Sequence, residues 1–437
     1  MSRRDAIALW INERWGFYGW AMLAVGFLAL FGTGPGQSYT IGLFFGPLIR
    51  ELSLSNTMIS AVYGLGTAIA ALGLPYTGRL VDRHGPRRLL AAIALLLGGV
   101  CLLFPLVSHV VALFFAFTAV RFLGQGSLTL AATNLVSQWF VRRRGLALSV
   151  TSLGFALGLA AYPPVVQRLI AQVGWRQSWV WLGLCVWVLL LPAVLVLVVD
   201  RPDRLRLLPD GDSAAPATAE PSADGSSEGT EENWTPREAL RTATFWILAV
   251  GLAVPSALIT GMYIYHVSYF RERGLSAQLA ADMFSITSIS MVAAMLLFGQ
   301  LLDRAPTRFV IAGGILLNSV AMGVMFVIHD TATAVLYAIL LGATSGAMMT
   351  NASYVWPRYF GRRHLGGIQG PAYTITIIGA SLGALPFGMA YDLLGAYRPA
   401  VGLLALLPLV FGVIVAFLPP PVRRKGGAAA PADANDG

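Results

Sequence analysis

The stretch Gly78-Arg-Leu-Val-Asp82-Arg83-His-Gly-Pro-Arg87-Arg88 recurs about 220 residues later as Gly299-Gln-Leu-Leu-Asp303-Arg304-Ala-Pro-Thr-Arg308. A second stretch, Trp139-Phe140-Val-Arg142-Arg143-Arg144-Gly145, recurs as Tyr359-Phe360-Gly-Arg362-Arg363-His364-Leu-Gly366. Each copy occupies a short basic loop between two apolar runs. Many secondary carriers consist of two homologous halves that hold the solute where the repeats meet. The repeat therefore predicts a carrier with two halves.

The composition requires most of the chain to face lipid. Of its 437 residues, 56% are hydrophobic and only 12% are charged, which is too much apolar surface for a water-soluble core. Apolar runs long enough to cross a bilayer are found at roughly 17–46, 56–78, 89–107, 110–138, 145–171, 177–199, 243–270, 278–301, 309–328, 332–357, 366–391 and 399–418. The sequence predicts an all-α membrane protein with twelve transmembrane helices in two pseudo-symmetric six-helix bundles.

A polar interval separates the two sets of six runs. We expect an N-terminal bundle over 1–200, a cytoplasmic linker over 201–241, a C-terminal bundle over 242–420 and a disordered cytoplasmic tail over 421–437. The middle of the linker is rich in Ser, Ala, Pro and Gly, which predicts partial disorder. Thr235-Pro-Arg-Glu238 has the pattern of a capping box with Pro at the first helical position. A short surface helix is therefore expected before the seventh span.

The distribution of basic residues predicts the orientation. Of the 30 Lys and Arg residues, 23 lie in the N-terminus, the even-to-odd loops and the tail, six lie on the opposite side, and Arg121 lies inside a span. The positive-inside rule places both termini and the linker in the cytoplasm of a multi-pass inner-membrane protein. Anionic lipid headgroups then account for the net charge of +9. Nucleic-acid binding is not expected, because no basic patch carries interleaved aromatic residues.

Metal, disulfide and catalytic chemistry have no sequence signature here. Cys101 and Cys185 each lie in the middle of a separate apolar run, and the five histidines are scattered along the chain. The sequence shows no nucleophile–base pair, metal cluster or phosphate-binding loop. We expect neither an enzyme nor a cofactor.

The two Gly-x-Leu-x-Asp-Arg loops resemble the motif between helices 2 and 3, and 8 and 9, of the major facilitator superfamily. The second copy lacks the Gly after Asp-Arg and has Ala305-Pro306 instead. The resemblance implies a gating latch in which the small residue permits close helix approach and the aspartate caps or pairs across the halves in one state. The residues assigned to this latch are Gly78, Asp82, Arg83, Asp303 and Arg304. The alternative is that these charges only anchor the loops at the headgroups.

Within that superfamily the chain is similar to the monocarboxylate porter and oxalate/formate antiporter group. The stretches that carry this likeness are Tyr18-Gly19-Trp20, Trp139–Ala147 with Gly154 and Gly158, His266–Tyr269 with Gly274-Leu-Ser276, and Tyr359–Arg363. The group's helix-8 arginine, which binds the substrate carboxylate, corresponds to Met295 here, and its acidic residue one turn earlier corresponds to Met291. The usual clamp for an anion is therefore missing.

Arg121 is the one charge expected near the middle of the bilayer. An arginine there costs about 2.5–3.5 kcal/mol on insertion scales, so it needs a wet cavity or a partner. It either attracts an anionic solute or hydrogen-bonds carbonyls and polar groups of helix 1 without touching the solute. The residues assigned to solute binding, polar groups in otherwise apolar spans, are Arg121, Tyr39, Gln125, Tyr162, Tyr263, His266, Asn351 and Tyr373. His266 is the one group of this set that titrates near neutral pH.

The sequence therefore predicts a monomeric secondary active or facilitative transporter, a symporter or antiporter, that works by alternating access. Its partners are the lipid bilayer and a small organic solute, most simply a monocarboxylate or related organic anion, with proton coupling left open. Two alternatives remain: a drug or metabolite efflux antiporter, and a membrane receptor with a carrier fold and no flux. An efflux antiporter of this superfamily carries Gly-x-x-x-Gly-Pro in helix 5, whereas Gly158 is followed by Leu159.

Overall fold

The computed structural model describes residues 3–211, 234–361, 364–419 and 421, without the side chains of residues 3–7, 15, 82 and 366. Throughout these residues the regular structure is helical. The N-terminal helices are α1 (Arg3–Trp15), α2 (Gly19–Gly32), α3 (Ser38–Leu52), α4 (Asn56–His84), α5 (Pro86–Leu103), α6 (Val110–Val120), α7 (Thr129–Trp139), α8 (Arg144–Cys185) and α9 (Leu191–Leu197). The C-terminal helices are α10 (Pro236–Leu240), α11 (Ala243–Glu272), α12 (Ala277–Arg304), α13 (Thr307–Met325), α14 (Thr331–Phe360), α15 (Leu365–Leu382), α16 (Leu385–Leu394) and α17 (Arg398–Ala416).

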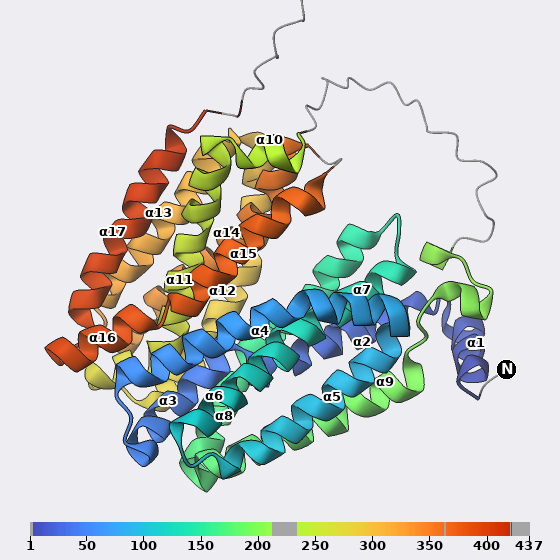
Figure 1. Ribbon diagram of the computed structural model, residues 1–437, viewed down its shortest axis with the longest axis horizontal. Helices are drawn as coiled ribbons and strands as arrows, with labels where there is room; N and C mark the ends of the chain where they lie inside the picture. Colours follow the sequence, from blue (N-terminus) through green and yellow to red (C-terminus); the bar gives the residue numbers. More distant parts are fainter. Residues whose placement is uncertain (1–2, 212–233, 362–363, 420, 422–437) are drawn as a thin grey trace, which may run out of the picture.

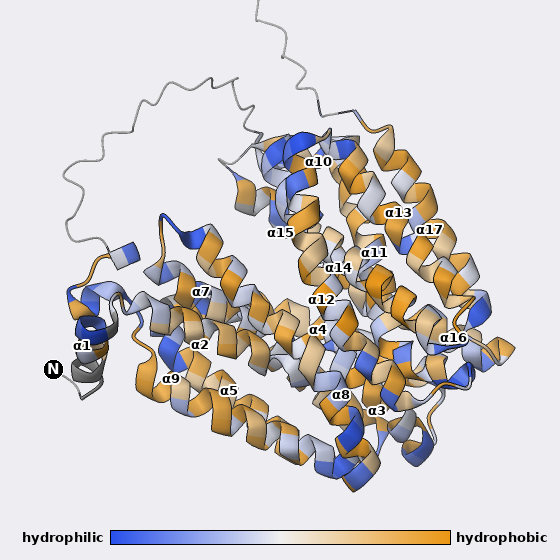
Figure 2. Ribbon diagram, turned by 180° about the vertical axis from the view of Figure 1, so that it is seen from behind, coloured by the Kyte–Doolittle hydropathy of each residue, from blue (hydrophilic) through white to orange (hydrophobic). Residues whose placement is uncertain are grey.

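Eleven continuous helical stretches of the described residues are long and apolar enough to cross a membrane. The longest, Arg144–Leu197, has 54 residues and is divided by a kink at Gly174, where φ is 81° and ψ is 166°. This division gives the twelve predicted spans. The apolar residues cover the outer helices, as Figure 2 shows for α5, α9, α13 and α17.

Four spans contain breaks or changes of helix type, and one of them is the sixth, where a π-helical segment, Val186–Leu190, lies between α8 and α9. The first span consists of α2 and α3, separated by a 3₁₀ turn at Gly34–Gly36, so the expected bend is present at the Gly-Pro-Gly run. The fourth span changes from α6 to a π-helical segment, Arg121–Leu128, before α7. Such segments are uncommon and are often found at functional sites. The eleventh span is divided between α15 and α16 near Gly383.

The two bundles meet at one end and diverge at the other, as Figure 1 shows. We call the end where α4 begins the closed end and the end that carries α10 the open end. Among the described residues, the hydrogen bonds between the bundles come from residues 56–60 and 156–164 on one side and residues 265–288 and 392–397 on the other. Apart from Ala156, near the middle of the fifth span, these residues lie toward the closed end. The two bundles are therefore joined to each other at this end.

Asn56 takes part in four of the hydrogen bonds that join the two bundles at the closed end. Its backbone N–H and side-chain Nδ2 donate to Asp392 Oδ1 at 3.1 and 3.0 Å. Its backbone carbonyl accepts from the Tyr265 hydroxyl at 3.0 Å, and its Oδ1 accepts from the Tyr397 hydroxyl at 3.2 Å. The first turn of α4, whose N–H groups have no partner within the helix, is thereby capped by the opposite bundle.

The latch residues lie near the open end. A Cβ on Gly78 would meet open space, so the close helix approach expected there is not present, because the bundles are apart at this end. Arg83, Asp303 and Arg304 are exposed, and the Asp82 side chain lies outside the described residues.

The linker helix α10 begins as its sequence indicated. The Thr235 side chain accepts from the Glu238 backbone N–H at 3.3 Å, and Glu238 accepts in return from the Thr235 backbone N–H at 2.8 Å. The Trp234 N–H donates to the Phe360 carbonyl at 3.0 Å and so ties this helix to α14. The middle of the linker, 212–233, and the expected tail from residue 422 to residue 437 lie outside the described residues.

Candidate functional site

A cavity of about 160 Å³ lies between the bundles at mid-length of the helices. It is lined by Gln37, Ser38, Tyr39, Gln125, Phe155, Ser256, Ile259, Thr260, Tyr263, Met291, Ser345, Met348 and Met349. Both halves contribute, since α3, the π-helical segment and α8 meet α11, α12 and α14 there. A site at the junction of the repeats is where carriers of this architecture hold their solute.

The two walls of the cavity differ in chemistry. The N-terminal half supplies two amides and two hydroxyls, from Gln37, Ser38, Tyr39 and Gln125, together with the ring of Phe155. The C-terminal half supplies three methionines and Ile259, together with four hydroxyl groups, from Ser256, Thr260, Tyr263 and Ser345. Tyr263 and Ser345, on this second wall, are hydrogen-bonded to each other at 2.9 Å. The walls therefore differ in the amides of the first and the methionines of the second, while hydroxyl groups are found on both.

Arg121 lies directly behind the polar wall and is only 3% exposed. Its Nε donates to Thr67 Oγ1 at 3.0 Å, and its Nη1 donates to the Gly36 carbonyl at 3.0 Å and to Ser38 Oγ at 3.4 Å. The guanidinium also lies over the ring of Tyr63, 5.1 Å from its centroid. These are the contacts with carbonyl and polar groups of helix 1 that the second reading of Arg121 expected, and Ser38, one of the partners, also lines the cavity.

Ser38 has a particular place in this network. Its Oγ accepts from Arg121 and lies 2.8 Å from the Tyr63 hydroxyl. When Tyr63 donates in that bond, the Ser38 proton is free to point into the cavity. Ser38 then presents to the solute a donor that is polarised by a buried positive charge.

Of the residues assigned to solute binding from the sequence, Tyr39, Gln125 and Tyr263 line the cavity. Tyr162 is buried in the N-terminal bundle, where its ring lies 5.0 Å from that of Phe31. Asn351 is 1% exposed and lies against Gly314, and Tyr373 is 48% exposed on α15. These three and Arg121 are not among the lining residues of this cavity.

His266 lies on α11 in an aromatic cluster toward the closed end. It is 1% exposed, and its ring centroid lies 4.7 Å from that of Phe270, 4.4 Å from that of Phe284 and 5.5 Å from that of Tyr337. Within the described part of the chain, neither ring nitrogen has a hydrogen-bond partner, although the backbone of Ala280 lies beside the ring. His266 is therefore separated from the cavity by its own aromatic neighbours.

Sequence reasoning missed most of the C-terminal wall. Ser256, Thr260 and Tyr263 follow Pro255 at helical spacing and so share one face of α11. That polar face in an apolar span was a readable signal. Met291, at the position of the group's acidic residue, lines the cavity, whereas Met295 does not. Nothing in the pattern distinguished these methionines from packing residues.

Comparison with known proteins identifies the family. The sequence pattern of the Major Facilitator Superfamily matches residues 22–306 and 256–435. The chain belongs to the major facilitator superfamily. The resemblance drawn from the loop motifs is confirmed, and so is the twelve-helix fold. This superfamily member is a transporter and not an enzyme.

Several relatives cover nearly the whole chain. An oxalate:formate antiporter from Oxalobacter formigenes is 25% identical over 390 residues, which is 86% of this chain and 85% of the relative. Monocarboxylate transporter 13 from Bos taurus is 26% identical over 367 residues, 82% of this chain and 79% of the relative. Among solved structures, an inward-facing, unoccupied bacterial homologue of the human lysosomal transporter Spinster superposes with a TM-score of 0.66 at 16% identity, over 91% of this chain and 95% of that chain.

Proposed function

We propose that this superfamily member carries a small organic anion, of the monocarboxylate type, by alternating access of its two six-helix halves, 1–200 and 242–420. The observation that supports this substrate class is the link from the buried Arg121 through Ser38 to the cavity. Among the described residues, no carboxylate lies within ion-pair distance of Arg121. Its charge is thus free to act on a solute.

The charge is large enough to select an anion without touching it. A carboxylate that accepts from Ser38 would lie roughly 6–8 Å from the guanidinium, where two unit charges attract by about 2–3 kcal/mol at an effective dielectric constant of 20. That energy corresponds to roughly a thirty- to hundredfold preference over an uncharged analogue. The amides of Gln37 and Gln125 and the Tyr39 hydroxyl add further donors on the same wall.

The opposite wall determines the other end of the solute. Met291, Met348 and Met349 form an adaptable apolar surface that contacts an aliphatic or aromatic tail. A monocarboxylate with an apolar tail fits both walls, whereas a second carboxylate at the C-terminal wall would meet methionines and no cation among the described lining residues. The names of the oxalate:formate antiporter and of monocarboxylate transporter 13 agree with carriage of a carboxylate.

The test compares a carboxylate with its own primary amide. In proteoliposomes, Arg121→Gln should weaken the affinity for benzoate or a similar monocarboxylate by roughly thirtyfold or more and leave the affinity for the amide unchanged. Ser38→Ala should have a smaller effect of the same sign, and Arg121→Lys, which keeps the charge, is the matched control. If Arg121→Gln and the wild type bind the carboxylate with equal affinity, the solute is not selected by this charge, and a neutral or zwitterionic solute becomes the better assignment. Binding without uptake would favour a receptor, and uptake of varied lipophilic drugs an efflux antiporter.

We propose that the solute moves by facilitated transport or by exchange for another solute, without a proton-binding residue in the cavity. Among the described lining residues there is no Asp, Glu or His, and His266 lies outside the cavity. We propose that any proton carried with the solute travels as the carboxylic acid form of the solute itself. We propose a monomer, since each of the two halves that build the cavity belongs to the same chain.

The open end is proposed to face the cytoplasm of an inner membrane, so that this structure is the inward-facing state. The excess of basic residues in the loops of that end supports the orientation. A cysteine in place of the exposed Arg237 on α10 should react with impermeant thiol reagents only when they are supplied from the cytoplasmic side. A cysteine at the exposed Ser53, beside the closed end, should show the opposite behaviour. If Arg237→Cys reacts with the impermeant reagent in intact cells, the proposed orientation is wrong and the open end faces the outside.

A further inference from the structure

Two arginines at the closed end differ from the other basic residues on that side. The basic residues of the closed-end loops are Arg50, Arg168, Arg176, Arg271, Arg273 and Arg398. Arg168 and Arg176 form ion pairs with Asp282 and Glu51. Arg273 donates to the Phe326 carbonyl, and Arg398 lies over the Phe326 ring. Among the described residues, Arg50 and Arg271 have neither an ion pair nor a hydrogen bond.

These two arginines face each other across the boundary between the halves. Arg50 belongs to α3, and Arg271 belongs to α11, the repeat partner of the first span. A Cβ built on Gly46 would lie 3.6 Å from Arg50 Nη1 and 3.8 Å from Arg271 Nη1. Both guanidinium groups line one hollow of about 40 Å³, together with Gly46, Gln167 and Ser268.

The acidic residues beside the two arginines are engaged elsewhere. Glu51 pairs with Arg176 and also accepts from the Trp175 indole N–H. Glu272 accepts from the Tyr397 backbone N–H at 3.1 Å. Two positive charges therefore repel each other around a small hollow, with an amide and a hydroxyl as its remaining polar walls.

We propose that this hollow is a binding site for a small oxyanion, such as a carboxylate, which bridges Arg50 of the N-terminal half and Arg271 of the C-terminal half. A charge-assisted N–H···O bond is about 2.7–2.9 Å long, so one carboxylate reaches both Nη1 atoms from a position beside Gly46. Gln167 and Ser268 offer further donors to the same anion. Binding removes the repulsion between the two guanidinium groups.

The site depends on the conformation of the carrier. A Cβ on Gly42 would lie 2.6 Å from the Ile264 carbonyl oxygen, so α3 and α11 are in backbone contact about two turns away from the arginines. When the closed end opens, the two halves separate and the arginines with them. An anion that binds the paired arginines more tightly than the separated ones must favour the closed state to the same degree, by linkage. The anion concentration on that side of the membrane would then regulate the return step of the transport cycle.

This proposal does not rest on the proposed substrate, because the hollow and the central cavity share no residue. The two can be separated in an Arg121→Gln background, where the central positive charge is gone. In that background, formate replaces isethionate stepwise at constant ionic strength. The unfolding temperature of the purified protein is recorded at each formate concentration. Formate is small enough for the hollow, whereas the hydroxyethyl sulfonate is not.

Formate should raise the unfolding temperature, and Arg50→Gln or Arg271→Gln should lower the apparent formate affinity at least tenfold. Arg398→Gln, which removes an equal charge from the same face, is the matched control and should change it by less than twofold. Absence of a formate effect in the parent protein would overturn the proposal. An effect that survives both Arg50→Gln and Arg271→Gln would overturn it as well.

A tethered carboxylate provides a second test that does not depend on removing an arginine. Gly46→Asp places a carboxylate between the two Nη1 atoms, and the Cβ itself meets only ordinary contact distances there. Gly46→Asp should raise the unfolding temperature without formate, lose the response to formate and slow turnover, while the isosteric Gly46→Asn should do none of these. Identical behaviour of the Asp and Asn variants would contradict an anion site at this position.

Discussion

The carboxylate of Asp392 should stabilise the conformer in which the closed end is shut. It belongs to α16 of the C-terminal half and accepts three hydrogen bonds from the first turn of α4 in the N-terminal half. The donors are the Asn56 N–H at 3.1 Å, Asn56 Nδ2 at 3.0 Å and the Thr57 N–H at 2.7 Å. The positive end of the α4 dipole adds to the attraction. Opening this end breaks all three bonds.

Asp392→Asn keeps the size of the side chain but removes its charge and one of its two acceptor oxygens. Hydrogen bonds to a charged group contribute about 1.5–3 kcal/mol each, and neutral ones about 0.5–1.5 kcal/mol. Because Asp392 is exposed, solvent screening reduces the difference, and we expect a loss of about 1–2 kcal/mol for the closed state. The ratio of closed to open conformers should then fall by a factor of roughly 5–30.

The assay is a pair of nitroxide labels across the closed end, at Val173→Cys and Leu394→Cys, which are 46% and 63% exposed. Electron–electron distance distributions in nanodiscs, in a background without Cys101 and Cys185, should show a larger long-distance population in Asp392→Asn than in the parent protein.

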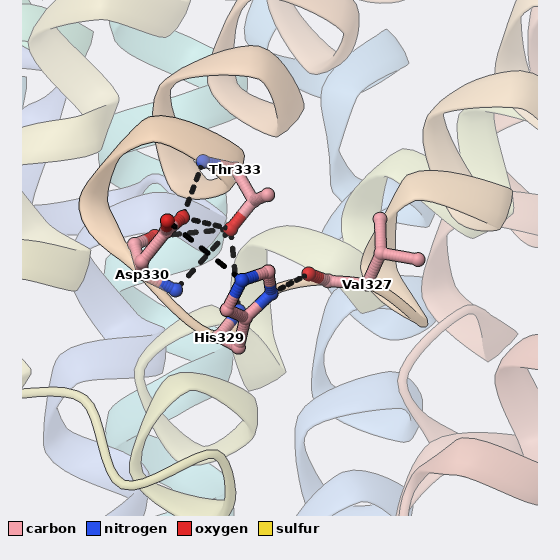
Figure 3. Close-up of polar contacts among 4 residues, drawn as sticks. All are labelled: Val327, His329, Asp330 and Thr333. Carbon is pink, nitrogen blue, oxygen red and sulfur yellow. Dashed lines mark hydrogen bonds and ion pairs between the residues drawn. The ribbon is translucent and has the colours of Figure 1, made fainter.

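Asp330→Asn is the matched control for this experiment. Asp330 caps α14 within its own bundle by accepting from the Thr333 backbone N–H at 2.8 Å, next to His329, as Figure 3 shows. Its loss should leave the distance distribution unchanged. If Asp392→Asn also leaves the distribution unchanged, the cross-bundle cap does not control closure and this reasoning fails.

Three further predictions follow from buried contacts and charges. His266→Gln should leave solute affinity and the pH profile of uptake between about pH 5 and 8 unchanged, because the ring lies outside the cavity; a flattened profile would return it to the coupling mechanism. Gly154→Leu should destabilise the fold by about 1–3 kcal/mol or more in thermal unfolding, since even its Cβ would lie 2.0 Å from a backbone oxygen, whereas Gly99→Leu, which meets open space, should be tolerated. Burial raises the pKa of the Asp210 carboxyl, but the backbone N–H donors of residues 141–143 outweigh it and hold that pKa below its usual value. The contact therefore contributes stability above about pH 4 that is lost as the pH falls through the lowered pKa, and Asp210→Asn should speed amide hydrogen exchange at those residues at neutral pH.

The sequence by itself determined the number and position of the spans. In lipid every backbone polar group must be satisfied within its own segment, so an apolar run of sufficient length has to be a helix. The break at Gly34–Gly36 was readable for the same local reason, because glycine and proline act on the backbone where they stand. The burial of Arg121 followed from its depth in the fourth span.

Which polar residues meet was decided only by the tertiary structure. Tyr39 and Tyr162 are both tyrosines in apolar spans, yet only Tyr39 reaches the cavity, and the sequence offers no difference between them. Whether a side chain lines the cavity depends on how its helix is rotated and where that helix crosses its neighbours, as at Gly42. Rotation and crossing position are set by the packed surfaces of both helices, so neither can be read from one segment of sequence. The closed end, the cap on Asn56 and the pair formed by Arg50 and Arg271 depend in addition on the conformational state, and one sequence encodes more than one of those states.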